Sequence, residues 1–100
     1  MIIQFKDIPP PLYIYQVACH CPKAMRTYLE LWRVRDCQNK IMILQKNVRT
    51  EYLISTAKFR HDILLLVSEG LLNLVEKINK NADTVLEIEL VNWDPENEVL

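Results

Sequence analysis

The chain has 100 residues, half of them hydrophobic and a quarter charged, and its formal net charge is −1. This composition is typical of a single globular domain and excludes a disordered segment. One glycine, Gly70, excludes glycine-rich phosphate loops and dinucleotide fingerprints, and no apolar run is long enough to span a bilayer. The first residues lack a signal-peptide pattern, and three cysteines make no disulfide framework. We therefore expect a cytoplasmic protein with no cofactor and no membrane contact.

The charge divides unevenly along the chain. Residues 1–61 contain ten Lys or Arg and four Asp or Glu, a balance of +6. Residues 62–100 contain two basic and nine acidic residues, a balance of −7. This asymmetry favours an anionic partner on one side of the molecule, although solvated faces that differ in sign by chance would give the same numbers.

Residues 1–21 are expected to form an extended N-terminal arm. An apolar patch at residues 2–5 is followed by three prolines at 9–11, which exclude a helix interior and a central strand. Residues 12–17 fit either a strand or a turn of helix. The apolar patch predicts an interaction surface, and a homodimer formed through this arm is one way to cover it.

Four segments between residues 22 and 70 have the spacing of regular structure. Pro22 suits the first position of a helix, and Ser55 or Thr56 suits a helix N-cap because a side-chain oxygen accepts an orphan N–H there. Gly70 tolerates the left-handed conformation that ends many helices. In chain order, we expect a helix over 22–36, a strand over 40–44, a helix over 46–53 and a helix over 56–69.

After Gly70 the apolar period changes from 3.6 to 2 residues. The leucines and isoleucine of 72–74 and 86–90 face one way, whereas Glu87 and Glu89 face the other. Turn-forming residues at 77–84 separate the two runs and predict a β-hairpin with a polar tip. Residues 94–100 are expected to form an acidic tail.

This order of elements resembles the winged helix-turn-helix family, in particular its small phage- and plasmid-encoded members. The resemblance covers residues 22–93 and implies an α+β fold with three helices, a small antiparallel sheet and a C-terminal hairpin wing. In that family the third helix lies in the major groove of DNA and the wing contacts backbone or minor groove. The residues that carry the resemblance are Ile43, Val48, Tyr52, Ile54, Ser55, Phe59, Ile63, Leu66 and the segment 69–72.

The resemblance implies a DNA-binding surface at the start of the 56–69 helix. Arg and Lys side chains can bond guanine or phosphate, and hydroxyls beside free helix N–H groups suit a phosphate oxygen. Phe59 and Ile63 are expected to anchor this helix from below, while its cationic side chains protrude together. The candidate DNA-binding residues are Lys46, Arg49, Ser55, Thr56, Lys58, Arg60, His61, Lys77 and Lys80.

Two functions remain open on this scaffold. The leading hypothesis is a small protein that binds double-stranded DNA, either a transcription regulator or a replication accessory. The alternative is a protein–protein interaction module that does not use DNA, because the second half of the chain is acidic and a fold does not dictate its function. Asp62 and Glu69 repel phosphate, so they would limit DNA contact to the first two turns of the helix.

Metal binding and catalysis are not expected. Cys19, His20, Cys21 and Cys37 offer four zinc ligands, but adjacent residues chelate a tetrahedral ion poorly, and we expect the cysteines to pack as small apolar groups. Carboxylates two apart on a solvated strand, such as those of Glu87 and Glu89, are typical of surface charge rather than of a general acid–base pair. The sequence therefore predicts that the protein is not an enzyme.

Overall fold

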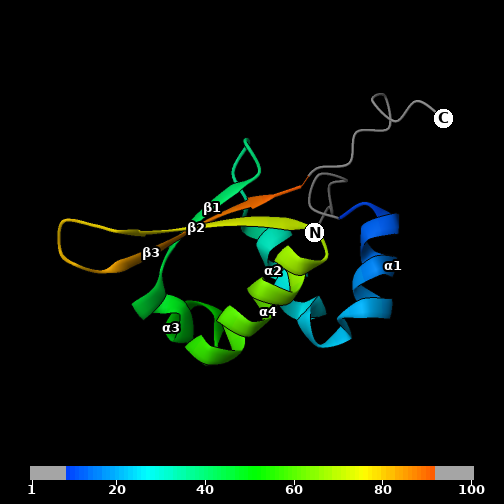
Figure 1. Ribbon diagram of the computed structural model, residues 1–100, viewed down its shortest axis with the longest axis horizontal. Coiled ribbons are helices and arrows are strands. Elements are labelled where there is room, and N and C mark those ends of the chain that lie inside the picture. The colour runs from blue at the N-terminus through cyan, green and yellow to red at the C-terminus, as the bar shows by residue number, and fades with distance from the viewer. Residues whose placement is uncertain (1–8, 92–100) are drawn as a thin grey trace, which may run out of the picture.

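The computed structural model describes residues 9–91 as helices packed on one face of a three-stranded antiparallel sheet (Figure 1). The predicted α+β class is confirmed. No helix within this part of the chain is long and apolar enough to cross a membrane. The elements, with 3₁₀ turns labelled η, are α1 (Pro11–His20), η2 (Pro22–Ala24), α2 (Met25–Val34), β1 (Lys40–Leu44), η3 (Gln45–Asn47), α3 (Val48–Tyr52), α4 (Thr56–Ser68), β2 (Leu72–Ile78) and β3 (Thr84–Leu90).

Helix α1 occupies most of the described part of the arm predicted over residues 1–21, so the extended conformation is wrong there. Of the strand and the turn of helix left open for residues 12–17, the structure has the helix, and residues 9–91 contain four α-helices instead of the expected three. Pro11 stands at the first helical position, where its missing N–H is not needed. The carbonyl of Pro10 accepts hydrogen bonds from the N–H groups of Tyr13 and Ile14 at 2.9 and 3.1 Å. Val17 is fully buried and attaches the helix to the core. The apolar patch at residues 2–5 lies outside the described residues, as does the predicted acidic tail.

The sheet places its apolar side against the helices. β1 and β2 both pair antiparallel with β3, which gives the strand order β1-β3-β2. The predicted period of two is confirmed on β1 and over 86–90 of β3, where alternate residues are buried. On β2 it holds only at the start, with Leu72 buried and Leu74 partly buried, and residues 75–78 are all exposed. The buried strand residues are Ile41, Ile43, Leu72, Leu86, Ile88 and Leu90.

Helix α4 is central, because it packs against η2, α2, α3 and β2. Phe59 and Ile63 are buried as predicted, and the ring of Tyr52 on α3 lies 5.3 Å from that of Phe59, centroid to centroid. The predicted N-cap is Ser55, whose Oγ accepts a hydrogen bond from the Lys58 N–H at 3.1 Å. The helices and strand expected over 22–36, 40–44 and 46–53 are all present, with ends shifted by a few residues.

Two turns around α4 use the left-handed backbone conformation. Gly70 has the predicted positive φ, +75°, just after the helix. Leu53, between α3 and α4, has a φ of +58° and a side chain that is 77% exposed. Such a conformation costs a residue with a Cβ about 1–2 kcal/mol. The α3–α4 turn is therefore built on a strained, exposed leucine.

Candidate nucleic-acid interface

The start of α4 forms an open hollow with the end of α3. Arg49, Ser55 and Thr56 line this hollow together with Leu53 and Ile54. Arg49 is exposed and forms no ion pair with a described residue. The free N–H groups at the N-terminus of α4 give this end of the helix a partial positive charge. Three of the predicted residues are thus brought together in a setting that suits an anion.

Lys58 is exposed, but its ammonium is held against the helical layer by a buried carboxylate. Its Nζ lies 2.5 Å from Asp62 Oδ1 and donates to the Lys23 carbonyl at 2.9 Å. Asp62 is only 1% exposed, and its Oδ2 accepts a hydrogen bond from Thr27 Oγ1 at 2.6 Å. Lys58 therefore neutralises a buried carboxylate that joins α4 to α2.

Arg60 points toward the other side of α4. Its Nη1 lies 2.5 Å from Glu76 Oε1 on β2 and donates to Gln45 Oε1 on η3 at 2.8 Å. Residues two apart on a helix differ in direction by about 200°. The prediction that Lys58 and Arg60 protrude together is therefore wrong, because each is drawn toward a different carboxylate.

The cations of the hairpin and of η3 are also divided. Lys46 Nζ lies 3.1 Å from Asp83 Oδ2 in the hairpin turn. Lys77 Nζ lies 2.8 Å from Glu87 Oε2, and the hydrogen bond from Lys77 holds the pKa of Glu87 below its ordinary value. Lys77 alternates with Glu76 along β2, so it lies on the opposite face of the sheet from α4. Lys80, at the hairpin tip, is exposed and has no ion pair within residues 9–91.

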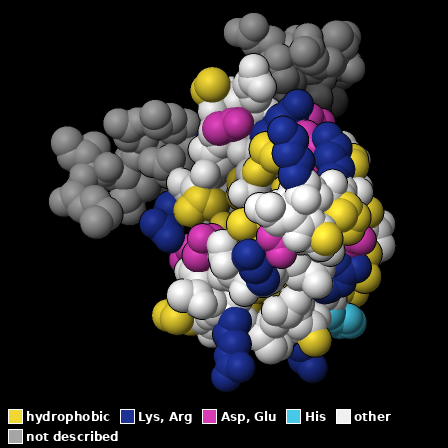
Figure 2. Space-filling view, turned by 90° about the vertical axis from the view of Figure 1, so that its left-hand side faces the viewer, with side chains coloured by type: hydrophobic (Ala, Val, Ile, Leu, Met, Phe, Trp, Pro, Cys, Tyr) yellow, Lys and Arg dark blue, Asp and Glu magenta, His cyan; other side chains and the backbone are white. Residues whose placement is uncertain are grey.

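The outward face of α4 carries little charge. His61 is exposed there, and Leu64, three residues further along, is 54% exposed. Figure 2 shows the end of the molecule that bears the hairpin tip, where Lys and Arg side chains occur over most of the face with acidic and apolar side chains between them. This surface is a mixed one rather than a contiguous basic patch.

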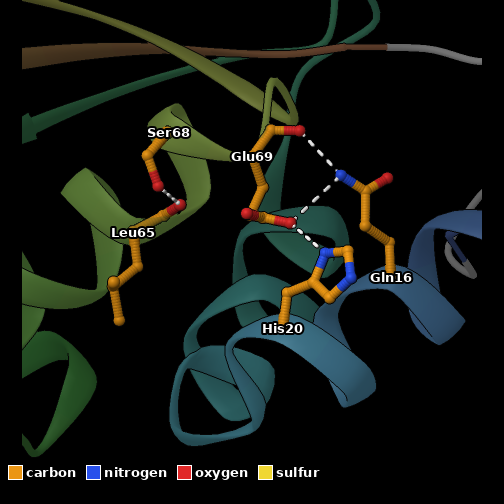
Figure 3. Close-up of polar contacts among 5 residues, drawn as sticks. All are labelled: Gln16, His20, Leu65, Ser68 and Glu69. Atoms are coloured by element: carbon orange, nitrogen blue, oxygen red, sulfur yellow. Dashed lines mark hydrogen bonds and ion pairs between the residues drawn. The ribbon is translucent and has the colours of Figure 1, made fainter.

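A polar cluster that the sequence did not predict joins α1 to the end of α4 (Figure 3). Gln16 Nε2 donates to the Glu69 carbonyl at 2.7 Å, and His20 Nδ1 lies 2.5 Å from Glu69 Oε1. The hydrogen bond from His20 lowers the pKa of the Glu69 carboxyl. His20 is thus engaged with a carboxylate, and no group of three or more metal-ligating side chains forms among the described residues.

The cysteines only partly follow the prediction that they pack as apolar groups. Cys21 is buried, and burial raises the pKa of its thiol. Cys19 and Cys37 are exposed, so the prediction is wrong for both. Cys19 lies on the outer side of α1, and Cys37 lies in the turn that precedes β1.

Asp62 and Glu76 form the ion pairs that orient Lys58 and Arg60. The sequence did not identify either of them as a partner of these cations. Asp62 stands four residues after Lys58, a spacing that brings helical side chains together and that signals the pair. Glu76 follows Arg60 by sixteen residues, and no local pattern links them.

Comparison with known proteins gives no match to any family model, curated protein or solved structure.

Proposed function

We propose that this chain is a winged helix-turn-helix protein that binds double-stranded DNA through the start of α4 and the β2–β3 hairpin. The order of α2, β1, α3, α4, β2 and β3, with β1 paired to β3, supports this proposal. In such proteins the second helix of the helix-turn-helix enters the major groove, and we assign this role to α4. A transcription regulator and a replication accessory both need this activity.

The observation that carries the proposal is the position of Arg60. It stands one turn after Thr56, so it continues the line of the hollow formed by Arg49, Ser55 and Thr56. Through Glu76 and Gln45 it also contacts β2 and η3. The α4 N-terminus and the hairpin therefore form one surface, which a duplex could contact with a helix and a wing together.

Binding should be weak and depend steeply on salt. Four of the predicted cations are paired with carboxylates, which leaves Arg49 and Lys80, with Arg60 once released, as the main phosphate contacts. Three contacts predict a slope of roughly −3 when log affinity is plotted against log salt, since each contributes about −0.9.

The test is fluorescence anisotropy of a labelled random duplex at low salt. Arg49→Gln and Lys80→Gln should each weaken binding uniformly across sequences and reduce the salt slope by about one. Lys40→Gln removes the same charge from the outer face of the sheet, away from the proposed surface, and should leave the slope unchanged. If the wild-type chain fails to bind at low salt, or if all three variants behave alike, the proposal is wrong.

One observation favours the alternative of a protein–protein interaction module. Leu53 and Leu64 are 77% and 54% exposed on the same helix-turn-helix whose cations are largely paired. A contiguous exposed apolar patch with a polar rim is typical of partner contacts, and under this alternative the two leucines belong to such a patch. Under this alternative, Leu53→Ser with Leu64→Ser would abolish capture of a protein partner, while the charge variants would have no effect.

A further inference from the structure

We propose that Glu76 occupies the place of a DNA phosphate on Arg60 in the unbound protein, and that DNA displaces it while Lys58 stays on Asp62. The inference rests on the proposed function and deepens it, because it assigns DNA contact to one of the two α4 cations and a masking role to a residue of the wing. It follows from the different surroundings of the two ion pairs.

Lys58 cannot separate from Asp62 without leaving a buried carboxylate with no cation beside it. Asp62 is 1% exposed and lies in the layer between α4 and α2, where Thr27 supplies its one other hydrogen bond. A buried carboxylate that loses its cation is strongly destabilised, because water cannot take the place of the missing charge. Lys58 also gives a hydrogen bond to the Lys23 carbonyl. This lysine is therefore a structural residue in the free protein and in the complex.

Arg60 is in the opposite situation. Its side chain is 36% exposed and that of Glu76 is 41% exposed, so both charges keep contact with water when they separate. Ion pairs this exposed to water contribute little to the stability of a fold. The second partner of Arg60, the Gln45 side-chain oxygen, is neutral and does not compete with an anion. A phosphate or a guanine edge can take over the guanidinium because Arg presents several N–H donors in one plane.

The position of Glu76 makes it the group that DNA must displace. It stands on the same face of the hairpin as Ile78, which is 68% exposed, so this part of the hairpin extends beyond the cover of the helices. A phosphate that approaches Arg60 here meets the carboxylate as a like charge. Removal of this carboxylate should therefore help DNA binding more than removal of an acidic group elsewhere.

The experiment measures duplex affinity at low salt for Glu76→Gln and, as the matched control, Glu89→Gln. Glu89 is exposed near the base of the hairpin on the outer face of the sheet and forms no ion pair with a residue in the described range. Glu76→Gln should bind about threefold or more tightly than wild type, in line with the strength of an exposed pair. Its salt slope should stay close to that of wild type, because Arg60 contacts DNA in both complexes once Glu76 is displaced or absent. Glu89→Gln should change affinity less than about twofold, because screening weakens the effect of a distant charge.

A double-mutant cycle ties the effect to Arg60. Glu76→Gln added to Arg60→Gln should give no gain over Arg60→Gln alone, because the masked cation is then absent. Equal gains from Glu76→Gln and Glu89→Gln, or a gain that persists without Arg60, would overturn the masking role while leaving DNA binding in place. Absence of duplex binding in wild type and in every variant would overturn the proposed function and this inference with it.

Discussion

The ammonium of Lys58 lies 2.5 Å from Oδ1 of Asp62, a carboxylate that is only 1% exposed. The pair spans one turn of α4, and Thr27 of α2 completes the hydrogen bonding of Asp62. Lys58 itself is 43% exposed, so a solvated cation here neutralises a buried anion. The start of α4 is fixed to the other helices by this contact as well as by the apolar side chains of Phe59 and Ile63.

Replacement of Lys58 by methionine should lower the free energy of unfolding by about 2–3 kcal/mol, because Asp62 then remains buried without its cation. Urea denaturation measures this loss. Lys58→Met combined with Asp62→Asn should recover part of it, since an amide keeps the hydrogen bond to Thr27 without a charge. The control is Lys23→Met, because only the backbone carbonyl of Lys23 takes part. An equal effect of the two lysine variants would contradict the prediction.

Ser55→Ala should destabilise the protein by about 1 kcal/mol, the usual contribution of an N-cap. The side chain accepts the Lys58 N–H, which otherwise has no partner at the end of the helix. Ser55→Asp should keep the stability of wild type, because a carboxylate also caps and favours the positive end of the helix. Ser68→Ala serves as the comparison at the other end of α4, where the exposed hydroxyl bonds only the Leu65 carbonyl. Thermal denaturation that ranks Ser55→Ala with Ser68→Ala would exclude the cap.

The two left-handed turns should respond in opposite ways to glycine. Leu53→Gly should raise the free energy of unfolding by up to about 1 kcal/mol, because relief of the strained φ exceeds the extra entropy of an unfolded glycine. Gly70→Ala should lower it by about 1 kcal/mol. A Cβ at residue 70 would meet no atom within 4 Å, so this loss comes from backbone conformation alone. A loss of stability in Leu53→Gly would show that the exposed leucine side chain supports the fold.

Acid should remove the contribution of the Glu69 contacts to stability. The hydrogen bond from His20, with a smaller one from Gln16, lowers the pKa of Glu69 from its ordinary 4.5. A carboxyl with a lowered pKa in the folded state stabilises the fold above the unfolded value and loses that stabilisation as the pH falls through the folded value. Glu69→Gln should therefore be less stable than wild type at pH 7, and the difference should shrink as the pH falls below the ordinary value of 4.5 and through the lowered pKa of Glu69.

The pH comparison needs a carboxylate elsewhere on the surface as its control. Glu51 on α3 is exposed and forms no ion pair with another residue of the described part of the chain. Glu51→Gln should differ little from wild type at either pH. If the stability difference of Glu69→Gln persists unchanged in acid, the contact with His20 does not act through the carboxylate charge.

Much of the fold could be predicted from local patterns. The apolar spacing of Phe59, Ile63 and Leu66 required a helix with one buried side, and the change to a period of two after Gly70 required a hairpin. The cap by Ser55 was predictable because capping acts within three residues. Helix α1 was not predictable, because the prolines at 9–11 suggested an extended segment. The residues that follow them have no clear helical or strand period of apolar side chains.

The sequence by itself determined the buried apolar side of α4 and which cations are available near its start, because periodicity and capping act over a few neighbouring residues. The tertiary structure alone decided that Arg60 meets Glu76 on β2 and that Gln16 and His20 meet Glu69, contacts that span 16, 53 and 49 residues. The direction of a long charged side chain depends on the carboxylate that packing brings within reach. The angle between α4 and the hairpin therefore sets the charge that this surface presents to a partner.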